Sequence, residues 1–183
     1  MNAPMTPPSP YSSSLGKSNV EKHTLSVLVD NEPGVLARVV GLFSGRGYNI
    51  ESLTVAEVAH AEHLSRITIV TSGPPEAIEQ VAAQLDRLVP VHQVKDLTLT
   101  GKSVERELAM IKVRGRGDDR SEALRVAEAF RARVIDASIE SFVFELTGAA
   151  DKINSFVELM RPIGLVEVSR TGVAAITRGP EPI

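Results

Sequence analysis

The chain has 183 residues, a formal net charge of −3 and no cysteine. This length allows one mid-sized domain or two small ones, and the absence of cysteine excludes disulfides, thiolate nucleophiles and cysteine-bound zinc. Hydrophobic residues make up 43% of the chain, enough for a globular core, whereas aromatic residues make up only 4%. A nucleic-acid-binding module is therefore disfavoured, because such modules stack bases on aromatic rings and neutralise phosphates with excess Lys and Arg.

The two ends of the chain differ in composition from the rest. Residues 1–22 contain four prolines and five serines, which predicts a disordered tail, and residues 179–183 form a second short tail. The sequence has no run of about 20 apolar residues that could span a membrane, and its start lacks the features of a signal peptide. We therefore expect a cytoplasmic protein.

Residues 23–100 change their hydrophobic period in a regular order. Alternation over residues 24–30 predicts a strand, and apolar residues at helical spacing over 35–43 predict a helix. Two extended runs then indicate a hairpin, a pair of prolines opens a second helix, and a last strand ends the unit; these elements cover residues 50–58, 64–71, 75–88 and 89–100. The predicted order is βαββαβ.

The same order repeats after a short linker at residues 101–104. Four strands are predicted, at residues 107–114, 133–138, 141–147 and 165–170. We expect Asp119 to cap the first helix of this unit and the second helix to end before Pro162. The sequence thus predicts an α+β protein with two tandem ferredoxin-like domains, at residues 23–100 and 105–178. Because each such unit leaves a sheet face and its edges uncovered, we expect a homodimer.

The sequence shows no catalytic constellation and no strong metal site. Residues Thr100–Ser103 resemble the end of a phosphate-binding loop, but Asp96 stands where that motif requires its first glycine. His60 and His63 flank one carboxylate in a polar hairpin connection, which is a weak ligand set and is better explained as a solvated loop. We assign no catalytic residue and no metal ligand, so a small enzyme on a ferredoxin-like fold is disfavoured.

The loop at residues 30–36 holds the most informative motif. Pro33 presets the first helical turn, and Gly34 leaves room beside the free N–H groups of the helix, which can bind a carboxylate. Asn31 has an amide that can pair with the head of an amino acid, although helix capping also explains it. A second asparagine, Asn49, begins the next strand, where it can also be a simple turn residue. The two loops lie at opposite ends of the helix, so two subunits about a two-fold axis could share both asparagines more easily than one subunit could use them.

These residues also carry a family resemblance. The first unit resembles the ACT domain, a regulatory module that commonly binds amino acids. The resemblance rests on the βαββαβ order and on a first strand that is followed by Asp-x-x-Pro-Gly-Val-Leu and a helix. The run Gly47-Tyr48-Asn49-Ile50-Glu51-Ser52 is a specific marker, and the chain over residues 23–179 is similar to the regulatory (small) subunits of acetolactate synthase. Thr171 and Thr177 stand where that family has serine, and the proline-rich N-terminal extension lies outside its pattern.

The resemblance implies a non-catalytic subunit that binds a thiamine-diphosphate-dependent catalytic subunit, raises its activity and confers feedback inhibition by valine in branched-chain amino-acid synthesis. Thiamine diphosphate, FAD and Mg²⁺ would belong to that catalytic partner. The valine site implied for this family falls on residues of two neighbouring subunits, namely Asn31, Gly34, Val35 and Leu36 of one and Asn49 and Ile50 of the other. Val35, Leu36 and Ile50 are expected to offer apolar surface to the branched side chain. The main alternative is a free-standing tandem ACT sensor that regulates another enzyme or transcription.

Overall fold

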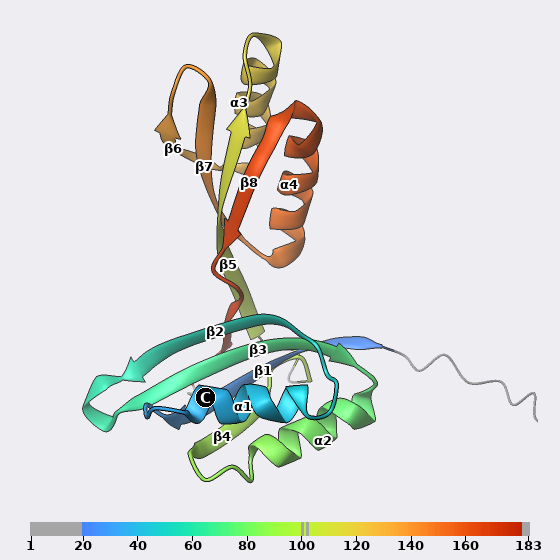
Figure 1. Cartoon of the computed structure of the whole chain (residues 1–183), viewed down its shortest axis with the longest axis vertical. Helices are drawn as coiled ribbons and strands as arrows, with labels where there is room; N and C mark the ends of the chain where they lie inside the picture. The colour runs from blue at the N-terminus through green and yellow to red at the C-terminus, as the bar shows by residue number, and fades with distance from the viewer. Residues whose placement is uncertain (1–19, 100, 102, 181–183) are drawn as a thin grey trace, which may run out of the picture.

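The computed structural model describes residues 20–99, 101 and 103–180, which form two domains joined at a narrow neck (Figure 1). The elements of the N-terminal domain are β1 (Glu21–Asp30), α1 (Val35–Ser44), β2 (Ile50–Ala59), the short 3-10 helix η1 (His60–Glu62), β3 (Leu64–Gly73), α2 (Pro75–Leu85) and β4 (Val91–Asp96). Those of the C-terminal domain are β5 (Ser103–Arg114), α3 (Asp118–Phe130), β6 (Arg133–Ala137), β7 (Ser141–Gly148), α4 (Ala150–Gly164), β8 (Leu165–Arg170) and β9 (Ala174–Thr177). Both domains contain the predicted βαββαβ order. None of the described helices combines the length and apolarity needed to cross a membrane.

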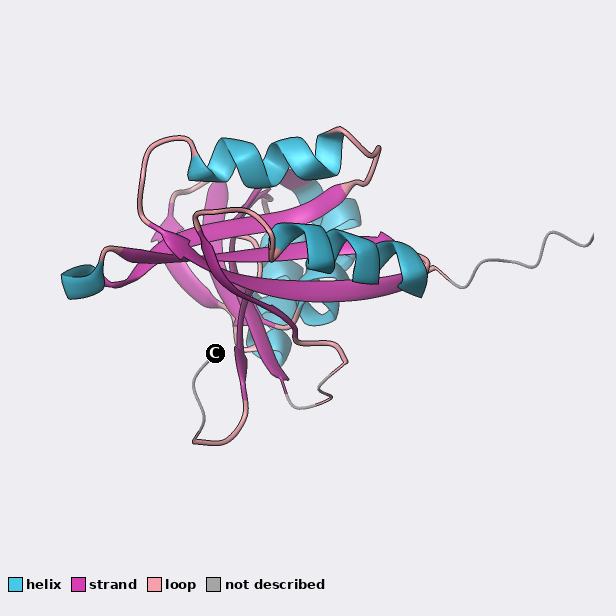
Figure 2. Ribbon diagram, turned by 90° about the horizontal axis from the view of Figure 1, so that it is seen from below, coloured by secondary structure: helices cyan, strands magenta, loops and turns pink. Residues whose placement is uncertain are grey.

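The N-terminal domain is an antiparallel sheet in the order β2-β3-β1-β4, with α1 and α2 on one face (Figure 2). Leu25 and Val27 lie opposite Ile69 and Ile67 in the β1–β3 register, and all four are buried against the helices. Phe43 of α1 belongs to the same core and is 1% exposed. The alternation of residues 24–30 thus places the apolar side chains of β1 under the helices, as the sequence predicts.

The C-terminal domain repeats this arrangement in the strand order β6-β7-β5-β8. Its core contains four phenylalanines. The ring of Phe156 lies 5.4 Å from Phe130 and 6.1 Å from Phe144, centroid to centroid, and Phe142 lies 5.5 Å from Phe144. The Phe144–Phe156 pair is edge-to-face, at an interplanar angle of 85°, which is a favourable geometry for aromatic rings. Four of the five phenylalanines of the chain are thus in this one core.

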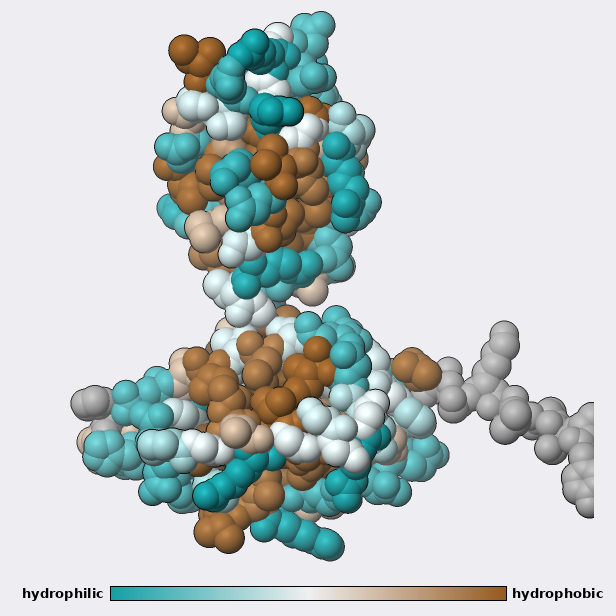
Figure 3. Space-filling view, viewed as in Figure 1, coloured by the Kyte–Doolittle hydropathy of each residue, from teal (hydrophilic) through white to brown (hydrophobic). Residues whose placement is uncertain are grey.

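The neck is built from a strand pairing that the sequence did not reveal. β5 pairs with β8 in the C-terminal domain, whereas its first residues, Ser103–Arg106, pair with β9. Val173 and Ala175 lie on the helix-free face of the N-terminal sheet, where they pack with Val70 and Leu97 in a small apolar cluster. Figure 3 shows the narrow neck between the two domains, with apolar surface on each side of it. The start of β5 and its partner β9 therefore extend the C-terminal sheet to the N-terminal domain, where β9 residue Ala175 joins the apolar cluster.

Several predicted boundaries are wrong. Glu21 and Lys22, expected in the N-terminal tail, are the first residues of β1, and Ser103, expected in the linker, begins β5. The last strand of the first unit is β4, which spans only Val91–Asp96. Residues 1–19, 100, 102 and 181–183, which include most of both predicted tails, lie outside the described residues.

Both helix-end predictions for the second unit are also wrong. α3 begins at Asp118 after Gly117, and no side chain caps it, so Asp119 lies inside the helix rather than before it. α4 continues through Pro162 to Gly164. A proline this close to a helix end removes only one backbone hydrogen bond, and Ile163 packs against the core, which favours the last turn.

Candidate functional site

The N-terminus of α1 is an open anion-binding geometry. Gly34 precedes the helix with φ of 88° and ψ of −11°, a left-handed conformation that favours glycine. It is exposed, and a Cβ built there would meet nothing within 4 Å. The first helical hydrogen bond of this turn runs from the Arg38 N–H to the Gly34 carbonyl. The N–H groups of Leu36 and Ala37 come before it, so the helical pattern provides no acceptor for them. These groups and the helix dipole can hold a carboxylate.

Asn31 lies beside this helix end on an anchored loop. Its backbone N–H donates to the His63 carbonyl at 2.6 Å, and the preceding Asp30 N–H donates to the Pro90 carbonyl at 2.9 Å. The Asp30 carboxylate also lies 2.6 Å from the His92 ring nitrogen. No side chain caps α1, so the explanation of Asn31 as a helix cap is wrong. Its exposed amide is available to a ligand.

Asn49 is exposed at the other end of α1, on a turn that the core holds in place. The Thr71 hydroxyl donates to the Asn49 carbonyl at 2.7 Å, and the flanking Tyr48 and Ile50 pack against the core of the domain. Sequence reasoning did not single out Thr71. Thr71 is 0% exposed, and a buried hydroxyl needs a hydrogen-bond partner, but β3 also carries Ser65, Thr68 and Ser72, so the sequence alone does not distinguish Thr71 from them.

The predicted site residues are only partly brought together within one chain. Leu36 is 40% exposed and lies next to Gly34, but the Val35 side chain is 3% exposed and belongs to the core. The expectation that Val35 offers apolar surface to a ligand is therefore wrong, because its position on α1 turns it toward the sheet. Asn31 and Asn49 lie at opposite ends of α1, which at 1.5 Å per residue is about 15 Å long.

Glu51, next to Ile50, is part of a small charged cluster on the N-terminal sheet. It accepts a hydrogen bond from the Ser72 hydroxyl, and its carboxylate lies 3.2 Å from the Lys22 ammonium. The Ser72 hydrogen bond and the nearby Lys22 charge lower the pKa of Glu51 below its ordinary value. The carboxylate is thus held ionised beside the start of β2.

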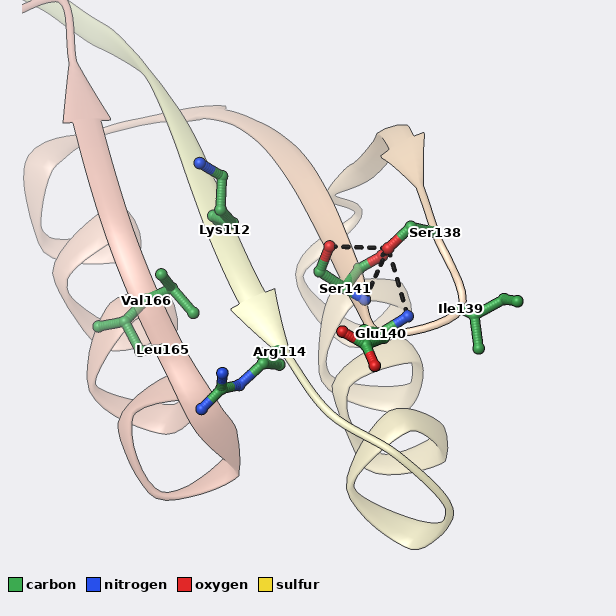
Figure 4. Close-up of a pocket in the computed structure, with 8 residues that line it drawn as sticks. All are labelled: Lys112, Arg114, Ser138, Ile139, Glu140, Ser141, Leu165 and Val166. Carbon is green, nitrogen blue, oxygen red and sulfur yellow. Dashed lines mark hydrogen bonds between the residues drawn. The ribbon is translucent and has the colours of Figure 1, made fainter.

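A separate open pocket of about 950 Å³ lies on the helix-free face of the C-terminal sheet (Figure 4). Its Ser138 hydroxyl accepts hydrogen bonds from the backbone N–H groups of Glu140 and Ser141, at 3.2 and 3.0 Å, so it stabilises a turn. Lys112, on its wall, pairs with Glu167 at 2.7 Å, which lowers the pKa of Glu167. Across residues 20–99, 101 and 103–180, no group of three His, Cys, Asp or Glu side chains is placed to hold a metal ion.

Comparison with known proteins covers both domains. The family model described as the small subunit of acetolactate synthase matches residues 106–179, and the model for an AHAS small subunit-like ACT domain matches residues 25–93. The chain is 48% identical over 158 residues to a probable acetolactate synthase small subunit of Archaeoglobus fulgidus, covering 86% of this chain and 98% of that one. It is 46% identical over 170 residues to the acetolactate synthase small subunit of Aquifex aeolicus, covering 92% and 88%.

A solved structure agrees in fold. The crystal structure of the acetolactate synthase small subunit from Thermotoga maritima matches with a TM-score of 0.78 and 40% sequence identity. The match covers 88% of this chain and 99% of that chain. The two-domain architecture is therefore shared along almost the whole length of that protein.

Proposed function

The chain belongs to the family of acetolactate synthase small subunits, and on that premise we propose that it activates the catalytic subunit of acetolactate synthase and makes it sensitive to valine. A small subunit implies a large partner, and we assign catalysis, thiamine diphosphate, FAD and Mg²⁺ to that partner. The observation that carries the effector part of the proposal is the open helix end at Gly34, with the exposed Asn31 beside it.

In this proposal the α-carboxylate of valine accepts hydrogen bonds from the N–H groups of Leu36 and Ala37. The positive end of the α1 dipole adds to this interaction. The side-chain carbonyl oxygen of Asn31 accepts from the ammonium group, and the exposed part of Leu36 contacts the isopropyl group. Since one methyl group is worth only about 1–3 kcal/mol in such a pocket, selectivity among valine, leucine and isoleucine is graded.

The proposed site is completed by a second copy of the chain. β2 is an edge strand of ten residues, and it runs parallel to β1 because both are antiparallel to β3. A long exposed edge favours pairing with another strand. If two β2 strands pair antiparallel about a two-fold axis, the start of one β2 lies beside the end of the other. Since β1 and β2 are parallel and Asn31 directly follows β1, Asn31 lies at the side of the sheet where β2 ends. Asn49 and Ile50 of one subunit therefore approach Asn31 of its partner.

A site between subunits gives valine a way to inhibit. A ligand shifts an equilibrium only by its differential affinity for the two states, so valine must bind the inhibited arrangement more tightly than the active one. Residues from two subunits change their separation when the subunits change their packing, and the affinity for a ligand between them changes with it. We infer that valine stabilises the subunit packing in which the chain activates the catalytic subunit less strongly.

Reconstitution tests the proposal. The purified chain is titrated into the catalytic subunit while acetolactate formation from pyruvate is measured, with and without valine. We expect the chain to raise the rate and valine to lower it again, whereas the catalytic subunit alone does not respond to valine. Valine binding without any effect on acetolactate formation would instead favour a free-standing ACT sensor, and acetolactate formation by the isolated chain would contradict a non-catalytic role.

A further inference from the structure

Besides the apolar cluster of Val70, Leu97, Val173 and Ala175, the two domains meet at a hydrogen bond that lies close in sequence to the proposed effector site. The Ser52 hydroxyl of β2 accepts a hydrogen bond from the Val173 N–H at 2.9 Å, and the two residues are 121 positions apart. Gly172 lies against the same strand with φ of 84°, and a Cβ there would stand 2.8 Å from both the Ser52 and the Thr54 hydroxyl oxygens. Below we call the contacts of Ser52 with Gly172 and Val173 the domain joint.

On its other side the domain joint is tied to the C-terminal domain. Arg170 donates to both carboxylate oxygens of Glu107, which is 5% exposed, and its guanidinium also donates to the Asn154 side chain of α4 at 2.8 Å. Thr171 exchanges hydrogen bonds with the Leu108 backbone, at 3.0 Å from its own N–H and 3.1 Å to its hydroxyl. Residues 170–171 thus move with the C-terminal domain, whereas residues 172–173 rest on the N-terminal sheet.

The N-terminal side of the domain joint is continuous with the proposed valine site. Ser52 follows Ile50 by two residues on β2, and the register between β2 and β3 shifts between these two residues. Such an irregularity bends a strand and redirects its side chains. A displacement of the start of β2 therefore reaches Ser52 over two residues of one strand, without passing through the core.

We propose that the domain joint sets the orientation of the C-terminal domain and carries the effector signal from the start of β2 to it. This inference rests on the proposed function for the origin of the signal, but not for the orienting role. Gly172 is required because no other residue both adopts its positive φ and leaves room for the two hydroxyl groups. Ser52 and Gly172 are thus positioning residues, with no contact to the effector.

The orienting role is tested by distances between spin labels in the full chain. Since the protein has no cysteine, Gln80→Cys on α2 and Glu158→Cys on α4, both exposed, accept labels specifically. Labelled chain is diluted with unlabelled chain so that only distances within one chain are read. We expect a narrow distribution in the otherwise unaltered protein and a broader or shifted one in Ser52→Ala and Gly172→Ala, with thermal melts verifying that both variants fold.

Two matched control variants show whether a change in the distances arises at the domain joint or from the type of substitution alone. Gly179→Ala introduces the same side chain at a φ of 101° where nothing lies within 4 Å, and Ser169→Ala removes an exposed hydroxyl on β8. Both should leave the distance distribution unchanged. Unchanged distributions in the two joint variants, or equal broadening in the controls, would overturn the orienting role.

The coupling role is tested in the reconstituted enzyme. Ser52→Ala should leave the valine affinity of the isolated chain, measured by calorimetry, unchanged within experimental error. In the reconstituted enzyme, the factor by which valine lowers the rate of acetolactate formation should fall by about fivefold or more. A loss of valine affinity in the isolated chain would mean that Ser52 serves the effector site itself, and full inhibition at saturating valine would mean that the signal takes another route. If valine does not inhibit the unaltered complex, the proposed function fails, while the distance measurement still decides the orienting role.

Discussion

Replacing Gly34 by aspartate tests the anion site directly. The substituted carboxylate would stand at the open end of α1, where nothing lies within 4 Å of a Cβ, so it can enter without displacing a neighbour. It would accept from the helix N–H groups and repel the α-carboxylate of valine. Two unit charges about 4 Å apart repel by about 1 kcal/mol in water and about 4 kcal/mol near a protein surface, which corresponds to about 5- to 1000-fold weaker binding.

The cost to the fold should be small. Gly34 has a positive φ, and a non-glycine residue there costs about 1–2 kcal/mol, with Asp and Asn the best tolerated. Gly34→Asn is therefore the matched control, because it has the same shape and the same backbone preference without the charge. We expect both variants to melt at similar temperatures.

The assay combines calorimetry of valine binding with valine inhibition of the reconstituted enzyme. Gly34→Asp should lose inhibition while it retains activation, and Gly34→Asn should bind valine more tightly than the aspartate variant does. Equal affinities of the two variants would refute the electrostatic reasoning, and unchanged inhibition in Gly34→Asp would place the valine site elsewhere.

Three further predictions concern Asn49, Glu51 and Gly164. Asn49→Ala should weaken valine binding about tenfold, and mixing it with Asn31→Ala chains should restore one intact site per mixed dimer; no recovery on mixing would show that the asparagines do not act across subunits. Because the pKa of Glu51 is lowered from its ordinary value of 4.5, this carboxylate stabilises the fold above that pH, and the stabilisation is lost as the pH falls through the lowered value. Glu51→Gln should therefore have a lower melting temperature than the unaltered protein at neutral pH, and this difference should shrink in acid. A difference in melting temperature that does not change with pH would contradict a stabilising role of the ionised Glu51. Gly164→Ala should lower the free energy of unfolding in urea by about 3 kcal/mol or more, because a Cβ there would collide with the Arg114 carbonyl oxygen of β5, whereas Gly41→Ala, with nothing within 4 Å, should cost nothing.

The α+β architecture could be predicted from the sequence because its signals are local. Alternation over residues 24–30 and helical spacing over 35–43 both arise from one apolar face per element, and each face is visible within about ten residues of chain. The loop at Gly34 is local as well, since a left-handed residue before a helix favours glycine wherever it occurs. These features required no knowledge of the rest of the chain.

The helix-end predictions failed where distant contacts outweighed local preference. Pro162 predicts a helix end, but packing of Ile163 against the core retains one more turn. Asparagine is a residue type typical of helix caps, yet the backbone N–H of Asn31 donates to the carbonyl of His63, in the turn between η1 and β3, and α1 begins only after Gly34. In both cases a contact between elements decided the outcome, and propensity is a weak preference that such contacts override.

The sequence by itself determined the two βαββαβ units, the family resemblance and the candidate residues Asn31, Gly34 and Asn49. Only the tertiary structure decided that Val35 faces the core and that Ser52 meets the backbone of Val173. The physical reason is the range of the interactions. Hydrophobic periodicity is written in neighbouring residues, whereas a hydrogen bond between residues 121 positions apart has no signal in either segment alone.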